Sequence, residues 1–315
     1  MIRRFLPPCA ALLWCALAVA GCSDPPAGLT GAAVPVTATL PVVTSTAVPA
    51  TLPALSNTPT TPPGATTRPP ATHPATTAPH RPPALWTPAP GTAWQWQLTN
   101  PVDLSVDVPV YDVDGTYTTP DEVTALHAKG RKVICYVNAG AYENFRPDDS
   151  AFPASVLGRS NDWPGERWLD IRQLAVLRPI MAARFATCRN KGFDAIEADE
   201  VDGYTENTGF PLTSHEQLTY NTMLAQLAHQ RGLSIALKND VDQVPQLVGV
   251  FDFAIDEQCF EFDECATLLP FVRAGKAVLE VEYNLSNSQF CPRARAMGFS
   301  SMRKNLALDP PRWAC

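Results

Sequence analysis

Acidic residues crowd into one short stretch, residues 192–204, which reads GFDAIEADEVDGY. The stretch begins as an apolar strand, and Glu197, Asp199, Glu200 and Asp202 follow at its end. A strand holds side chains in place, and carboxylates crowded together raise one another's pKa values. Such an arrangement suits acid–base or nucleophilic chemistry. A solvated or calcium-binding acidic turn is the other interpretation, and this stretch alone does not decide between the two.

Apolar or β-branched runs recur along the chain and alternate with helical patterns. Pro120 follows Thr119 in a capping-box pattern that ends with Glu122, and residues 214–217 read as a second capping box. Gly130, Gly192 and Gly232 are placed to end helices. The predicted strands are 94–98, 108–113, 132–137, 167–171, 193–198, 233–237, 251–255 and 277–281.

Alternating strands and helices predict a parallel sheet, and about eight such units predict an α/β fold of the (β/α)8 TIM-barrel class. A doubly wound open sheet is the alternative, but no Gly-x-Gly-x-x-Gly motif follows the first predicted strand. Residues 299–302 look like a further strand, so the strand count is open by one. Trp94 and Trp96 alternate on the first strand, and we expect both to face the barrel interior.

In a TIM barrel the active site lies at the C-terminal ends of the strands. Acidic and amide side chains stand at almost every one of these ends, with tyrosines among them. Carboxylates and amides bind sugar hydroxyls and aromatic faces stack on sugar rings, so the set predicts a carbohydrate site, although each residue alone could be an ordinary turn residue. The residues are Asp112, Asp114, Tyr136, Asn138, Asp170, Glu197, Asp199, Asp202, Lys238, Asn239, Asp240, Asp256, Glu257, Gln258, Glu280, Glu282, Tyr283 and Asn284.

The N-terminal 92 residues carry targeting and spacing signals rather than a fold. Residues 1–22 have a basic start, a short apolar core and the end Val19-Ala20-Gly21-Cys22, which resembles a bacterial lipoprotein signal. That signal implies lipidation of Cys22 and a membrane anchor; an ordinary secretory peptide is the alternative. Residues 23–92 are rich in Pro, Thr and Ala and predict a disordered, extended linker. The catalytic domain is expected at 93–315, in an exported protein.

The net charge of −7 disfavours nucleic acid as a partner and favours a neutral or cationic substrate. Beyond the N-terminal segment there is no second long apolar run. We expect a monomer that requires no cofactor.

Six cysteines fall in the predicted domain, and an even number in an exported chain predicts disulfides. Two pairings are local along the chain and the third follows by elimination: Cys259–Cys265, Cys291–Cys315 and Cys135–Cys188. A zinc site is the alternative, but no Cys-x-x-Cys spacing supports it and the histidines are scattered. We therefore expect no metal.

Several of these segments together resemble glycoside hydrolase family 114. They are 94–98, 130–136, 192–204, Lys238-Asn239 and 256–259, and they occur in the expected order along 93–315. The resemblance implies a (β/α)8 barrel and an endo-α-1,4-polygalactosaminidase. Such an enzyme cleaves inside polysaccharides of α-1,4-linked galactosamine and N-acetylgalactosamine, which are found in biofilms.

The resemblance also implies that Asp199 and Glu257 are the catalytic pair. Where many relatives have Pro-Asp-Asn, this chain has Ala198-Asp199-Glu200, which changes the surroundings of the acid. Glycoside cleavage needs one protonated and one ionised carboxyl group. Glu257 lies between Ile255 and Phe260 and is expected to be the general acid, with Asp199 as nucleophile or base. Retention and inversion are not separable from sequence.

The remaining candidates are substrate-binding residues. Lys238 and Asn239 are expected to bind hydroxyl groups, or else to form a buried pair that holds the top of the barrel. Asp112, Asp170, Asp202 and Glu282 are candidates for the ammonium groups of galactosamine, with arginine salt bridges as the alternative. Asn138, Tyr136, Tyr204 and Tyr283 are expected to line the cleft.

A non-catalytic glycan-binding lipoprotein with the same barrel is the alternative function, and a structural surface protein is a third. The presence of both expected catalytic carboxylates argues against the glycan-binding lipoprotein, because a decayed enzyme usually loses one of them. The many acidic strand ends argue against the structural surface protein, which would not need them.

Overall fold

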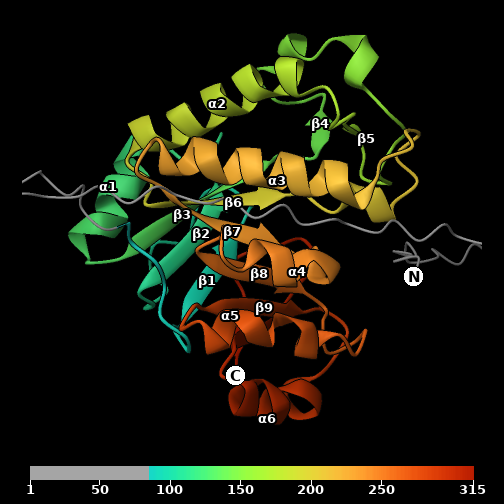
Figure 1. The fold of residues 1–315 in the computed structure, drawn as a ribbon. Helices are drawn as coiled ribbons and strands as arrows, with labels where there is room; N and C mark the ends of the chain where they lie inside the picture. The colour runs from blue at the N-terminus through green and yellow to red at the C-terminus, as the bar shows by residue number, and fades with distance from the viewer. Residues whose placement is uncertain (1–84) are drawn as a thin grey trace, which may run out of the picture. The chain divides into compact units, whose positions relative to one another are not determined.

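The computed structural model describes residues 85–315; the predicted signal peptide, Cys22 and the linker up to residue 84 lie outside the described residues. Its centre is a β-sheet flanked by helices (Figure 1). Eight strands of this sheet run parallel, and a ninth, β11, pairs antiparallel with the eighth. In sheet order the strands are β1 (Trp94–Gln97), β2 (Val110–Asp114), β3 (Lys132–Asn138), β6 (Ala195–Asp199), β7 (Ser234–Lys238), β8 (Phe253–Glu257), β9 (Val278–Glu282), β10 (Ser300–Lys304) and β11 (Arg312–Ala314).

The two ends of this sheet are joined by hydrogen bonds, which give it the form of a nearly closed barrel. The Trp94 indole on β1 donates to the Ser300 carbonyl on β10 at 2.8 Å. The backbone N–H of Leu98 donates to Leu308 at 3.0 Å. The prediction of an α/β TIM-barrel fold is confirmed.

Two parts of the strand prediction need correction. Residues 167–171 were expected to form a barrel strand, but β5 (Glu166–Trp168) pairs antiparallel with β4 (Ala141–Glu143) in a separate two-stranded sheet. Both β4 and β5 belong to the long connection between β3 and α2. Residues 167–171 therefore pack within that connection and do not form a barrel strand. The run at 299–302 supplies the eighth barrel strand, β10.

Six α-helices join the strands within residues 85–315, and β1 connects to β2 without one. Figure 1 shows α2 and α3 side by side over one side of the sheet, and the two helices are in contact. The helices are α1 (Pro120–Ala128), α2 (Leu174–Lys191), α3 (Ser214–His229), α4 (Val244–Leu247), α5 (Leu269–Arg273) and α6 (Asn287–Met297). Short 3-10 turns are η1 (Asp149–Ala151), η2 (Ala154–Val156), η3 (Gly203–Thr205), η4 (Val241–Gln243) and η5 (Cys265–Leu268).

The predicted helix boundaries are mostly correct because they depend on local chemistry. Thr119 caps α1 in a capping box with Glu122, and Gly192 ends α2 in the left-handed conformation at φ 96°. The second capping box is shifted by one residue: Thr213, not Ser214, is the N-cap of α3, and its partner is Glu216.

Side chains alternate between two cores along each barrel strand. Trp94 and Trp96 are buried inside the barrel with Ile134 and Phe253, as expected. Tyr111 and other residues of the opposite parity pack between the strands and the helices. Which core a strand residue enters therefore depends on its place in this alternation.

Three disulfides link the described chain: Cys135–Cys188, Cys259–Cys265 and Cys291–Cys315. These are the pairings expected from the sequence. The first ties β3 to α2, and the last ties the C-terminal residue to α6. None of the helices between residues 85 and 315 combines the length and the apolar character needed to cross a bilayer.

Candidate active site

Three neighbouring strands end in the side chains that form the site. Asp199 ends β6, Lys238 ends β7 and Glu257 ends β8. All three point into the barrel mouth, because their same-parity neighbours Ala195, Ala236 and Ile255 belong to the interior core. The site thus lies at the C-terminal ends of the strands, as expected for a barrel enzyme.

The Lys238 ammonium group is the centre of this arrangement. Its Nζ donates to Asp199 Oδ1 at 2.8 Å and lies 3.1 Å from Glu257 Oε2 and 3.2 Å from Glu197 Oε1. Nζ also lies 4.8 Å from the centroid of the Trp96 ring. Burial alone would lower the pKa of Lys238, but the carboxylates of Asp199, Glu257 and Glu197 raise it well above its usual value. The amine therefore stays charged.

Two tyrosines complete the contacts of the proposed catalytic carboxylates. Tyr136 Oη donates to Asp199 Oδ2 at 2.8 Å, and Tyr283 Oη donates to Glu257 Oε1. Burial, and then the neighbouring carboxylate, raises the pKa of each tyrosine well above its usual value, so each hydroxyl keeps its proton. Asn239 Oδ1 accepts from the backbone N–H of Glu257 at 3.1 Å and holds the end of β8. The carboxylates remain partly open, with side chains 17% and 20% exposed for Asp199 and Glu257.

Two further carboxyl groups lie beneath this layer. Asp112 on β2 and Glu197 on β6 are both fully buried inside the barrel, where the charge of Glu197 acts on the pKa of Asp112. Burial raises the pKa of Glu197 to about 7 and raises that of Asp112 well above its usual value. Asp112 was expected to bind substrate; it lies instead below the residues that are open to a substrate.

A second acidic group lies at the rim of the site, beside Asp199. Glu166 on β5 accepts from Asn138 Nδ2 at 3.1 Å and from Asn161 Nδ2 at 2.9 Å. Asn161 also reaches Glu200 Oε1 at 3.4 Å. Burial, then nearby Asp199, raises the pKa of Glu200 well above its usual value, and burial raises that of Glu166 to about 7. None of these contacts brings a basic side chain to the rim, so an ammonium group bound there would favour the ionised forms of Glu166 and Glu200.

Four of the predicted binding residues have other positions. Asp170 pairs with Arg172 at 2.6 Å beside the start of α2, which is the salt-bridge alternative. Glu282 is buried on the outer face of β9, where its Oε1 accepts from the backbone N–H of Phe260 at 2.8 Å. Asp202 and Tyr204 follow β6 around η3, beyond the strand end that carries Asp199.

The sequence placed Glu197 and Glu200 in the acidic stretch without giving either a role of its own, and it did not single out Glu166 or Asn161. Glu197 lies two residues before Asp199 on one strand, so its position on the same face was readable. Glu166 and Asn161 carried no such signal, because their segment was expected to be a barrel strand and the loop before it. Their position depends on the fold of the connection between β3 and α2.

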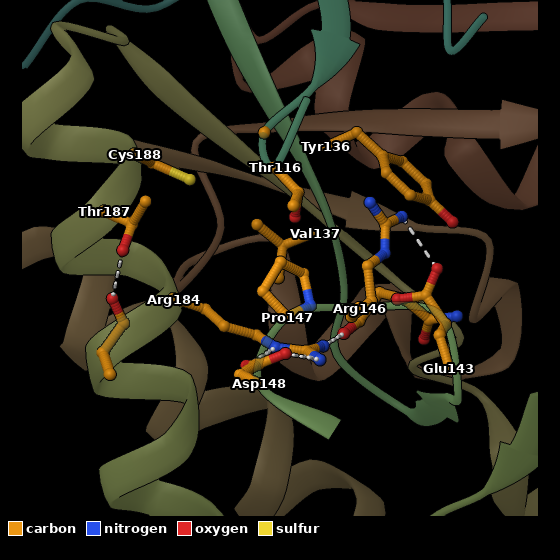
Figure 2. A pocket seen from close by; sticks show the side chains of 13 residues that line it. Thr116, Tyr136, Val137, Glu143, Arg146, Pro147, Asp148, Arg184, Thr187 and Cys188 are labelled. Carbon is orange, nitrogen blue, oxygen red and sulfur yellow. Dashed lines mark hydrogen bonds and ion pairs between the residues drawn. The ribbon is translucent and has the colours of Figure 1, made fainter. Parts of the chain in front are cut away.

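A pocket of about 290 Å³ lies beside Tyr136, between β3, α2 and the chain around residues 143–148 (Figure 2). Asp199 and Glu257 do not line it. Arg146 in its wall pairs with Glu143 and Asp114, both at 2.7 Å, and Arg184 pairs with Asp148 at 2.7 Å. Both guanidinium groups are thus already neutralised, so we place the chemistry at the strand ends and not in this pocket.

The arrangement can perform general acid–base and nucleophilic chemistry with its own side chains. Two partly open carboxylates share one ammonium, and each also receives a phenol hydrogen bond. Among residues 85–315 no group of three or more His, Cys, Asp or Glu side chains is arranged to hold a metal ion.

Comparison with known proteins assigns the chain to a family. The model of glycoside-hydrolase family GH114 matches residues 75–315. The crystal structure of Aspergillus fumigatus Ega3 in complex with galactosamine is 38% identical, covers 73% of this chain and 97% of its own, and has a TM-score of 0.70. The glycoside hydrolase domain of PelA from Pseudomonas aeruginosa, 15% identical, shares the fold with a TM-score of 0.55 and covers 70% of this chain and 97% of its own. No curated protein matches the chain. The chain therefore belongs to glycoside-hydrolase family GH114.

Proposed function

We propose that the protein is an endo-acting hydrolase of polysaccharides that contain α-1,4-linked galactosamine, with Asp199 and Glu257 as its catalytic pair. One observation carries the proposal: Asp199, Lys238 and Glu257 end adjacent strands, and the single ammonium holds both carboxylates at the barrel mouth. The relative Ega3, whose structure contains galactosamine, supports the choice of substrate.

We further infer that the reaction retains configuration at the anomeric carbon. One oxygen of each carboxyl group contacts the same nitrogen at 2.8 and 3.1 Å, so these oxygens lie less than about 6 Å apart. Retaining glycosidases separate the two groups by roughly 5–5.5 Å, and inverting ones by roughly 6.5–9.5 Å to leave space for a water molecule. The contact through Lys238 favours the shorter spacing.

In the first step the Asp199 carboxylate attacks the anomeric carbon, and Glu257 gives its proton to the glycosidic oxygen as that bond breaks. Lys238 and Tyr136 hydrogen-bond to Asp199 and stabilise its ionised form. In the second step Glu257, now ionised, takes a proton from water. The resulting hydroxide attacks the anomeric carbon and releases Asp199.

The acidic rim supplies selectivity for a cationic sugar. Glu166 and Glu200 lie next to Asp199 and are bridged by Asn161. A substrate ammonium group in contact with them would compensate charges that are costly to bury alone. A neutral N-acetyl group gives no such compensation. We infer that at least one sugar beside the cleaved bond must carry a free amine.

The test uses purified protein and partially deacetylated α-1,4-galactosaminogalactan. Mass spectrometry is expected to detect short hexosamine oligomers, and proton NMR is expected to show the α anomer as the first product. Asp199→Asn and Glu257→Gln are expected to lower the rate by at least about 1000-fold. Asp107→Asn changes a fully exposed carboxylate near Arg131 and is the matched control.

Near-normal turnover in either catalytic variant would overturn the assignment of the pair. A first product in the β configuration would overturn retention. Binding of the polymer without cleavage by the wild-type protein would favour a glycan-binding module.

We also propose that the protein is exported and anchored through a lipid on Cys22, with residues 23–92 as a spacer before the catalytic domain. Three disulfides support export, because disulfides persist in oxidising compartments. Cys22→Ser is expected to release the protein from the membrane fraction into the soluble one. An unchanged distribution would contradict the anchor.

A further inference from the structure

We propose that Asp112 works as a protonated acid that donates a hydrogen bond to ionised Glu197, and that this buried pair controls how strongly Lys238 stabilises the charges of Asp199 and Glu257. The two residues are positioning residues that act through Lys238. This inference rests on the proposed function, because it concerns the protonation of that catalytic pair.

The buried surroundings of the two carboxyl groups favour a proton between them. Both side chains are fully buried inside the barrel. Among the described residues no N–H or O–H donates to either oxygen of Asp112, and the contact of Glu197 with a basic group is the one to Lys238 at 3.2 Å. Two carboxyl groups can hydrogen-bond to each other only if one of them carries a proton. Two ionised carboxylates in contact, without water, would repel strongly.

The position of Lys238 decides which group is ionised. Its ammonium lies against Glu197 Oε1, whereas Asp112 has no ion pair. The negative charge is therefore more stable on Glu197, and the proton on Asp112. The pKa values agree: burial and then the charge of Glu197 raise that of Asp112 well above its usual value, while that of Glu197 rises only to about 7.

Other charged and titratable groups face this pair from the neighbouring strands. Asp199 lies above it on β6 and Glu257 on β8. Tyr136 on β3 and Tyr283, directly after β9, keep their protons. Asp114, the next inward residue on β2, is paired with Arg146 at 2.7 Å. Lys238 is thus the basic group shared between Glu197 below and the catalytic carboxylates above.

The consequence for catalysis follows from charge sharing. While Glu197 is ionised, part of the field of the ammonium is used to balance it. If Glu197 became neutral, the ammonium would act on Asp199 and Glu257 alone and would stabilise their ionised forms more strongly. The general acid would then lose its proton at a lower pH, so the buried pair extends activity toward neutral and alkaline pH.

The experiment compares the pH–rate profiles of two isosteric variants. Glu197→Gln removes the charge and is expected to move the alkaline limb to lower pH by about one unit or more. Asp112→Asn keeps a hydrogen-bond donor to Glu197, as a protonated acid does, and is expected to keep the limb at its wild-type position. Glu280→Gln makes the same change at an equally buried glutamate on the outer face of β9 and is the matched control. If the alkaline limb of the pH–rate profile moves equally in Glu197→Gln and Asp112→Asn, or moves in neither, the proposal is overturned.

Infrared spectroscopy supplies a readout independent of activity. A buried protonated carboxyl group gives a carbonyl band that Asp112→Asn is expected to remove and Glu197→Gln to retain. Loss of the band in Glu197→Gln instead would place the proton on Glu197 and refute the proposal. If the wild-type protein does not cleave the polymer, the proposed function is refuted, and with it the expected effect of the pair on the pH–rate profile. The infrared band would still show which of the two carboxyl groups holds the proton.

Discussion

Lys238 is the residue on which the other site residues depend. It is 2% exposed and contacts three carboxyl groups, two from β6 and one from β8. Desolvation makes such a group costly, and only its partners offset that cost. The sequence left open whether this lysine binds substrate hydroxyls or forms a buried ion pair. Its burial supports the second role.

Removing the ammonium should therefore destabilise the protein strongly. Lys238→Met is expected to lower the free energy of unfolding by about 3 kcal/mol or more near pH 7, because Glu197, Asp199 and Glu257 lose their shared counter-ion. The loss should shrink as the pH falls and Glu197, whose pKa is raised to about 7, takes up a proton. Urea unfolding at pH 5 and pH 8 measures both effects.

Lys132→Met provides the contrast. Lys132 pairs with Asp194, but its side chain is 43% exposed, so the pair is worth less than about 1 kcal/mol. Equal destabilisation by the two variants would contradict the importance of the buried contacts.

Glu166 should make substrate binding depend on pH. Its pKa is raised to about 7 by burial, so below that pH it becomes neutral and attracts an ammonium group less. Binding of a galactosamine oligomer is expected to strengthen from about pH 6 to 7, where amines are still protonated. Calorimetry in a Glu257→Gln background avoids turnover.

In the same background, Glu166→Gln is expected to bind more weakly and to lose this pH dependence, whereas Asp107→Asn should keep it. A pH dependence that persists in Glu166→Gln would assign it to another group.

At the scale of the elements, the strand ends carry an unusual backbone. The residues directly after Asp199, Lys238 and Glu257 are Glu200, Asn239 and Gln258, with φ of 60°, 49° and 65°. Side-chain-bearing residues rarely adopt this left-handed conformation, which costs roughly 1–2 kcal/mol each. The chain thus turns sharply after each site residue. Strain of this kind at an active site is sustained by the surrounding fold, and here the barrel supplies that support.

The N-cap of α3 is Thr213, whereas the sequence predicted Ser214, and two substitutions distinguish these positions. Thr213→Ala is expected to lower the free energy of unfolding by about 1 kcal/mol, because the Thr213 side chain accepts from the Glu216 backbone N–H. Ser214→Ala should cost less, since Gln243 Nε2 keeps its bond to the Ser214 carbonyl. Chemical denaturation of both variants measures the difference. A larger loss in Ser214→Ala would restore the capping box expected from the sequence.

At the scale of the whole molecule, a second set of acids is buried on the outer face of the sheet. Asp256 on β8 is the register partner of Glu280 on β9, and Glu282 follows two residues later on the same face. All three are fully buried. Burial and the charge of Glu282 raise the pKa of Glu280 well above its usual value, and burial also raises that of Glu282. The folded state therefore holds protons that the unfolded chain releases.

The stability should consequently fall as the pH rises. Above the unfolded pKa of about 4.3 the folded protein binds more protons than the unfolded chain, and the linkage relation makes the free energy of unfolding decrease until the folded groups also ionise. Glu280→Gln removes one of these groups and is expected to flatten the decline between pH 5 and pH 8. Thermal unfolding across that range tests it, and an unchanged slope would show that Glu280 does not contribute.

Much of the fold was readable from the sequence, because it depends on short-range chemistry. The Thr119 capping box, the glycine that ends α2 and the alternation of strand side chains need only neighbouring residues. The disulfides followed from the even number of cysteines and from two short separations. The acids at the ends of β6 and β8 were identifiable because a strand of known direction places its last residue at the barrel mouth.

The tertiary structure decided the depth and direction of each acid. Asp112 and Asp199 both appear as acids at strand ends, but the relative register of the strands buries the first beneath the second. Glu282 lies on the outer face because it has the opposite parity to Tyr283. Asp170 belongs to a connection that does not enter the barrel, and Glu166 reaches the rim through that same connection. These outcomes depend on contacts between residues far apart in sequence, for which local spacing carries no information.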